Sequence, residues 1–182
     1  MLDEADIING CIKGDSKCQS LLYQKYSRLL YGTALRYTRC EEDAQDVLQD
    51  AFLRIFDTIK QYKGNGKLVS WMTKIVINQA LKLYQQQKKF AIEDYEEYQD
   101  SIKDDSIVDS DVLSHEVLLG FIRDLPEGYR MVFNLCEIEG YSYEEVAQML
   151  GCSNSTCRSQ LFKAKKVLQK KIIQFTNKDM SR

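Results

Sequence analysis

Apolar residues recur at spacings of three and four along most of this chain, and that spacing constrains its fold more than any other feature. Between residues 43 and 59 the stripe consists of Ala44, Val47, Leu48, Ala51, Phe52, Ile55, Phe56 and Ile59. Such a period places apolar side chains on one face of an α-helix. The 182 residues contain one proline, so few helices are interrupted. We predict an all-α protein.

The bulk composition narrows the class of protein further. A hydrophobic fraction of 44% and a charged fraction of 29% are typical of a soluble globular protein. No apolar run reaches the length of about 18 residues that a membrane helix needs, so we expect no membrane insertion. The N-terminal segment MLDEADIING is acidic and has no basic region before an apolar one, which argues against a signal peptide. We therefore expect a cytoplasmic protein.

The cysteines and histidine give no sign of a metal site or a catalytic site. The six cysteines include no C-x-x-C pair, and His115 is the only histidine. Zinc sites use cysteines and histidines at short regular spacing, so we expect reduced thiols that pack as small apolar side chains. A Ser-His-Asp or Cys-His set is disfavoured because His115 lies in an acidic segment. We therefore expect a protein that has no cofactor and no small-molecule substrate and that is not an enzyme.

Charge is segregated along the chain although the net charge is only −2. Residues 60–89 contain seven lysines and no acid, residues 90–112 contain nine acids and one lysine, and residues 153–182 contain eight basic residues and one acid. An acidic block between basic ones is typical of a solvated linker between modules that bind polyanions. We predict two small helical domains, 1–90 and 113–182, joined by a flexible acidic linker at 91–112.

The C-terminal domain has the pattern of a helix-turn-helix. Ser142 and Glu145 have capping-box spacing, Gly151 can form a tight turn, and Ser153 can cap the next helix. In that helix Cys157, Leu161, Ala164 and Leu168 share one face, which we expect to pack inward. The outward face carries the residues we expect to meet a DNA major groove: Arg158, Ser159, Phe162, Lys163 and Lys166. The alternative is a surface helix with ordinary solvated lysines.

The N-terminal domain has two candidate surfaces, each with a simpler alternative. Asp43, Asp46, Gln49 and Asp50 lie opposite the apolar stripe of their helix and could dock a basic partner, or the acids could only complement the helix dipole. Further on, Tyr62, Trp71 and Asn78 lie among lysines, around a glycine-bearing loop at 62–67 and a helix expected from Ser70. This combination suits single-stranded DNA, although a lone tryptophan in a helical stripe is more often a core residue.

Together these segments resemble an RNA polymerase sigma factor of the extracytoplasmic-function (ECF) group. DAQDVLQDAF resembles the core-polymerase-binding helix, SWMTKIVIN resembles the segment that melts and reads the minus-ten element, and GYSYEEVAQMLGCSNSTCRSQLFKAKKVL resembles the minus-thirty-five reader. The chain departs from the family at Gln45 and Gln160, which replace an acid and an arginine. It also has Leu68 where an aromatic residue is common, and Lys163 and Lys165 in place of arginines.

The resemblance implies roles for named residues. Asp43, Asp46, Gln49 and Asp50 would face the polymerase core. The downstream promoter element would be melted and held by Lys63, Asn65, Lys67, Leu68, Trp71, Lys74 and Asn78. Arg158, Ser159, Phe162, Lys163 and Lys166 would meet the upstream element. The implied partners are core RNA polymerase, promoter DNA and an anti-sigma factor. The alternative function is a stand-alone helix-turn-helix transcriptional regulator.

Overall fold

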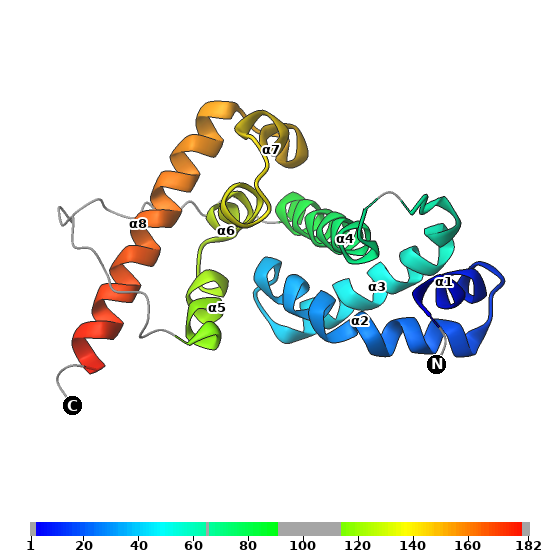
Figure 1. Cartoon of the computed structure of the whole chain (residues 1–182). Helices are drawn as coiled ribbons and strands as arrows, with labels where there is room; N and C mark the ends of the chain where they lie inside the picture. The colour runs from blue at the N-terminus through cyan, green and yellow to red at the C-terminus, as the bar shows by residue number, and fades with distance from the viewer. Residues whose placement is uncertain (1–2, 65, 91–113, 180–182) are drawn as a thin grey trace. The chain divides into compact units, whose positions relative to one another are not determined.

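The computed structural model describes residues 3–64, 66–90 and 114–179. Within these ranges the regular secondary structure is entirely helical and contains no strand, which confirms the all-α prediction (Figure 1). The chain divides into two compact units, Met1–Leu83 and Tyr84–Arg182. The acidic linker predicted at 91–112 lies outside the described residues, and each unit is described here by itself.

The N-terminal unit contains four helices and a short 3-10 turn. They are α1 (Glu4–Ile12), α2 (Ser16–Tyr37), α3 (Glu41–Thr58), η1 (Ile59–Gln61) and the part of α4 (Leu68–Phe90) that ends at Leu83. Side chains cap the first helices: Asp3 and Asp6 form a capping box on α1, and Asp15 accepts the backbone N–H groups of Lys17 and Cys18 at the start of α2.

The predicted apolar stripe of α3 forms much of this unit's core. Every member of the stripe is buried except Phe56, which is half-buried. The inward face of α2 is narrow, because Leu21 and Leu29 are exposed, Leu29 by 54%. Leu22, Leu30 and Ala34 are buried on the side of α2 that packs against its neighbours α1 and α3.

The α1–α2 contact depends on a glycine. A Cβ atom at Gly10 would lie 2.2 Å from the Sγ atom of Cys18, so only glycine allows the two helices to approach this closely. Cys18 and Cys11 are buried there, in keeping with the expectation that the cysteines pack as apolar side chains.

The C-terminal unit is built on one long helix. It contains α5 (His115–Arg123), α6 (Glu127–Phe133), a π-helical turn η3 (Asn134–Ile138), α7 (Tyr143–Leu150) and α8 (Asn154–Asp179), in yellow-green to red in Figure 1. Leu125 packs with Ala164 and Leu168 of α8, and partly buried apolar side chains surround them: Phe121, Ile122, Tyr129, Phe133 and Val167. The α5, α6 and α7 helices all contact α8.

Candidate nucleic-acid interface

The helix-turn-helix of the C-terminal unit forms through the local signals predicted for it. The Ser142 hydroxyl accepts the Glu145 backbone N–H at 3.3 Å, and Glu145 Oε2 accepts the Ser142 N–H at 2.8 Å. Gly151 closes α7 in the left-handed conformation, with φ of +64°. The Ser153 hydroxyl then accepts the Thr156 N–H at 3.1 Å and so caps α8. These three local hydrogen bonds and one glycine therefore fix where α7 begins and ends and where α8 begins.

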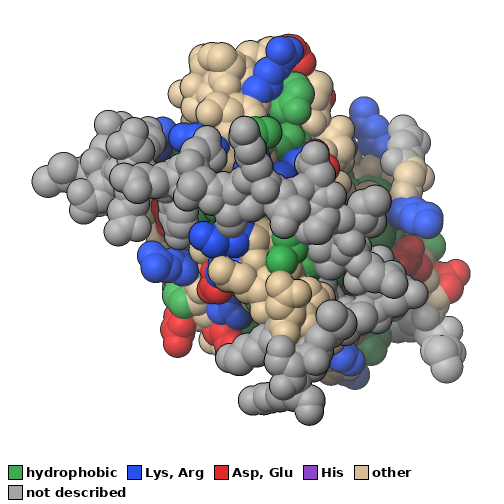
Figure 2. All heavy atoms as spheres, turned by 90° about the vertical axis from the view of Figure 1, so that its left-hand side faces the viewer, with side chains coloured by type: hydrophobic (Ala, Val, Ile, Leu, Met, Phe, Trp, Pro, Cys, Tyr) green, Lys and Arg blue, Asp and Glu red, His purple; other side chains and the backbone are tan. Residues whose placement is uncertain are grey.

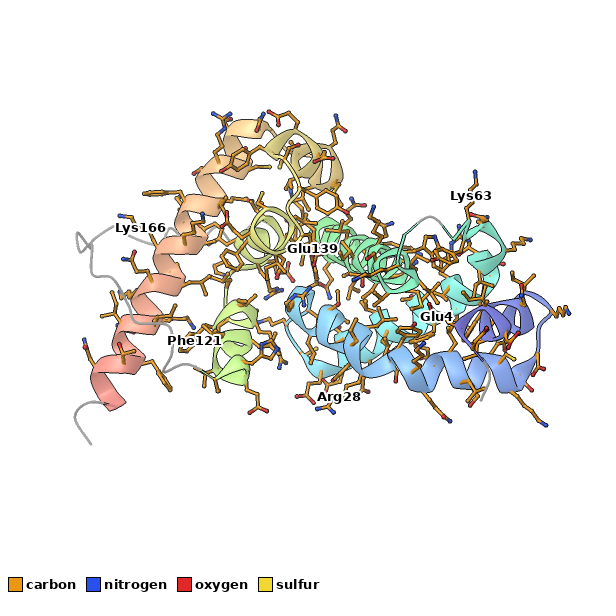
Figure 3. All side chains as sticks on the ribbon, in the orientation of Figure 1. Glu4, Arg28, Lys63, Phe121, Glu139 and Lys166 are labelled. Carbon is orange, nitrogen blue, oxygen red and sulfur yellow. The ribbon has the colours of Figure 1, made fainter. Side chains whose placement is uncertain are left out.

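The two faces of α8 are divided as predicted. Cys157, Leu161, Ala164 and Leu168 are all buried, whereas Arg158, Ser159, Phe162, Lys163 and Lys166 are exposed. The Phe162 side chain is 57% exposed, and Lys166 Nζ lies 5.1 Å from the centre of its ring. Figure 3 shows Lys166 pointing away from the helices of its unit. Figure 2 views the side on which α8 lies in Figure 1, and there Lys and Arg side chains lie among exposed hydrophobic ones.

This mixture of groups suits a nucleic acid. Lysine and arginine attract phosphates, and an exposed apolar ring between them can contact a thymine methyl group. A helix that follows a capped turn and presents such a face has the geometry of a recognition helix in a major groove.

Residues of α7 also contact the start of α8, and the sequence pattern did not indicate these contacts. The Arg158 guanidinium carbon lies 5.4 Å from the centre of the Tyr143 ring. Asn154 Nδ2 donates to Glu144 Oε1 at 2.6 Å. This hydrogen bond lowers the pKa of the Glu144 carboxyl, and the Arg158 charge lowers that pKa further. The sequence identified Glu145 as a capping residue but gave no signal for the two residues before it, Tyr143 and Glu144.

The residues predicted to bind the downstream element lie around the η1–α4 loop and along α4. Lys63, Lys67, Lys74 and Asn78 are exposed, and Lys63 projects outward from the loop (Figure 3). Trp71 is half-buried, and its ring centre lies 5.6 Å from that of Tyr62. The Tyr62 hydroxyl donates to the Gly66 carbonyl at 2.6 Å, which ties the end of the loop to this aromatic pair. Asn65 lies outside the described residues.

Two predictions about this segment are corrected. Leu68 is only 2% exposed, so its side chain belongs to the core of the unit and is not part of the surface proposed to meet DNA. The helix begins at Leu68 instead of Ser70, because the Lys67 carbonyl already accepts the Ser70 N–H at 3.0 Å. The first turn of α4 therefore buries Leu68 before the exposed polar positions follow.

The acidic face of α3 has a simple arrangement. Asp46, Gln49 and Asp50 are exposed on the side of the helix opposite its buried stripe, and their spacing of three and four residues makes them neighbours. Asp43 is half-buried in the first turn, where its backbone N–H contacts Cys40 Sγ at 3.5 Å. The first turn also contains Glu41 and Glu42, so this end of α3 is strongly negative.

Two family models match two separate segments of the chain. Residues 22–90 match sigma-70 region 2, and residues 115–168 match sigma-70 region 4. The chain belongs to the sigma-70 family, in its ECF group. The region 2 match includes α3, the η1–α4 loop and α4, and the region 4 match includes the helix-turn-helix.

Curated sigma factors resemble the chain over most of its length. It is 28% identical to an ECF RNA polymerase sigma-E factor of Haemophilus influenzae, over 94% of this chain and 96% of the relative. It is 29% identical to an RNA polymerase sigma-H factor of Pseudomonas aeruginosa, over 87% of this chain and 88% of the relative.

A solved structure supports the fold of this sigma factor. The sigma factor RpoE from Bartonella quintana, solved in complex with the anti-sigma factor NepR, superposes with a TM-score of 0.50 at 21% identity. That similarity covers 84% of this chain and 94% of the other. Among the helices of the described ranges, none is both long and apolar enough to cross a membrane.

Proposed function

We propose that this sigma factor binds core RNA polymerase, directs it to specific promoters, and reads the upstream promoter element with α8 while the N-terminal unit opens the downstream element. The observation that carries the proposal is the presence in one chain of a region 2 match and a region 4 match, the latter containing a capped helix-turn-helix with an exposed basic and aromatic face. A stand-alone regulator would need only the second of these.

Each surface has a role in this proposal. Asp43, Asp46, Gln49 and Asp50 dock on a basic surface of the polymerase. Lys63, Asn65, Lys67, Trp71, Lys74 and Asn78 hold the melted strand of the downstream element. Arg158, Ser159, Phe162, Lys163 and Lys166 meet the upstream element. The lysines supply phosphate contacts, since lysine lacks the two-pronged geometry with which arginine binds guanine.

The chain catalyses no reaction in this proposal, because it lends specificity to a polymerase that forms the new bonds. Such a protein works where the chromosome is, so we place it in the cytoplasm. The Bartonella quintana relative was solved with an anti-sigma factor. We propose that an anti-sigma factor also binds this chain, and copurification with endogenous proteins tests this proposal.

Transcription by purified components tests the function directly. Core RNA polymerase is incubated with this protein and a library of promoter fragments, and the transcripts are mapped. We expect transcripts with defined start sites only when the protein is present. DNA binding by the protein without any start-specific transcript on any fragment would favour the stand-alone regulator.

A further inference from the structure

The contact between Tyr143 and Arg158 joins the two helices of the helix-turn-helix at their outer edge. Tyr143 is the first residue of α7 and is half-buried, whereas Arg158 is exposed in the second turn of α8. The 5.4 Å from the guanidinium carbon to the ring centre is within the range in which a cation is attracted to an aromatic face. The ring therefore gives the arginine a preferred position before any DNA binds.

The surroundings of this contact hold both partners in place. The α7 start is fixed by the Ser142–Glu145 capping box, which leaves the Tyr143 backbone little freedom. Next to it, Glu144 accepts the Asn154 amide at 2.6 Å, and that bond joins the first turn of α7 to the first turn of α8. The Glu144 carboxylate also lies close enough to Arg158 for the arginine charge to lower its pKa. An aromatic face and a negative charge thus act on one guanidinium.

An arginine held in this way differs from a solvated one. A free arginine on a helix surface occupies many rotamers, and all but one must be given up when it binds a base edge with two hydrogen bonds. A side chain that is already confined loses less conformational entropy on binding, so its hydrogen bonds to the correct base contribute more to the binding free energy. Of the other exposed basic residues proposed to meet the upstream element, Lys163 has no such aromatic contact within the described part of the chain, and the contact of Lys166 is with Phe162 of its own helix.

We propose that Tyr143 is a positioning residue that holds Arg158 in the orientation with which Arg158 discriminates one base pair of the upstream promoter element. The inference rests on the proposed function, because it assumes that α8 reads DNA. Tyr143 sets sequence preference in this scheme while adding little to the total charge attraction. In the sequence, this positioning residue is the tyrosine that directly follows the capping Ser142.

The first test measures discrimination by the holoenzyme. Core polymerase with the full chain is offered a promoter fragment and its single-base-pair upstream variants, and the ratios of open complexes are compared. We expect Tyr143→Leu to reduce discrimination about three- to tenfold at the base pair that Arg158→Ala affects. Tyr143→Phe retains the ring face and should preserve the ratio. In the Arg158→Ala background, Tyr143→Leu should change nothing further.

The outcomes separate the inference from the function beneath it. The inference is wrong if Tyr143→Leu weakens binding equally on all sequences, or if it still reduces discrimination when Arg158 is alanine. Either result would mean that Tyr143 contacts DNA directly or affects the stability of the chain. If Arg158→Ala leaves every ratio unchanged, the base-reading role proposed for Arg158 is wrong, and the inference is wrong with it.

A second readout does not depend on DNA. In the free full chain, the ring current of Tyr143 should displace the NMR resonance of the Arg158 Nε–H group, and its heteronuclear NOE should report restricted motion. We expect Tyr143→Leu to abolish the displacement and lower the NOE, and Tyr143→Phe to retain both. Identical Arg158 signals in Tyr143→Leu and the unchanged chain would overturn the positioning role. Thermal unfolding of each variant shows that the chain remains folded.

Discussion

Arg130 Nη1 donates a hydrogen bond at 2.7 Å to the backbone carbonyl of Arg123, across the turn that joins α5 to α6. The same nitrogen lies 3.1 Å from the Leu125 carbonyl, and the Arg130 side chain is only 1% exposed. Its charge is complemented by Glu127, 3.9 Å away. A buried arginine thus satisfies the carbonyl of the last residue of α5, which has no partner within its own helix, and a carbonyl of the turn that follows it.

We expect Arg130→Met to destabilise the C-terminal unit by about 1–3 kcal/mol, because the change leaves buried carbonyl groups without donors. Hydrogen exchange of the α5 and α6 amides in the full chain measures this loss. Lys170→Met, a similar change at an exposed position of α8, should alter stability by less than about 0.5 kcal/mol. Equal effects of the two variants would mean that the Arg130 hydrogen bonds contribute little.

Charge reversal on α3 should prevent assembly with the polymerase. We expect the double variant Asp46→Arg, Gln49→Ala to abolish binding to core polymerase, since it places a positive charge on a face proposed to meet a basic surface. Both side chains are exposed, so the fold should be unaffected. Glu116→Arg, the same reversal on α5, is the control. Holoenzyme assembly unchanged by the double variant would remove both residues from the docking surface.

Trp71 should contribute to both promoter opening and stability. Stacking on an unpaired base is worth about 1–3 kcal/mol, whereas truncation of a buried tryptophan costs about 3–5 kcal/mol. Because the ring is half-buried against Tyr62, we expect Trp71→Ala to impair open-complex formation more than closed-complex formation, with a partial loss of stability. Permanganate footprinting and thermal unfolding measure the two effects. If opening falls only in step with unfolding, Trp71 is a core residue alone.

The α7 cap should make stability sensitive to acid. The Ser142 backbone N–H holds the pKa of Glu145 below its ordinary value of 4.5. A carboxyl whose pKa is lowered by folding stabilises the fold fully above its unfolded pKa, and this contribution is lost as the pH falls through the folded pKa. We expect the exchange protection of α7 amides to decrease below about pH 4.5. Glu145→Gln should weaken that dependence, and an unchanged acid profile would contradict the assignment.

Substitutions of Arg158 and Lys166 should have different kinds of effect if Arg158 reads a base and Lys166 contacts a phosphate. Arg158→Ala should cost about 1–3 kcal/mol and relax preference at one upstream base pair. Lys166→Ala should weaken binding on all sequences alike. It should also lower the slope of log affinity against log salt concentration by about one unit. Holoenzyme binding at several salt concentrations on single-base variants measures both. Equal losses on every sequence would mean that α8 supplies charge without reading bases.

The sequence alone determined that the chain is helical, where α7 begins and ends, and where α8 begins. The Ser142–Glu145 capping box, the Gly151 turn and the Ser153 cap were all predicted, because each depends on residues no more than four positions apart. The inward face of α8 followed from the helical period for the same reason. The family could also be identified from the sequence, because its motifs occur in the family's order along the chain.

The tertiary structure decided which side chains of different helices meet. Leu68 falls in the core and Leu29 on the surface, although both are leucines of α-helices, because only one side of each helix has a neighbour. The Tyr143–Arg158 contact and the burial of Arg130 depend on how helices cross or turn. Residues 15 positions apart meet only when two helices adopt a particular angle, and that angle is set by the packing of the whole unit and not by local spacing.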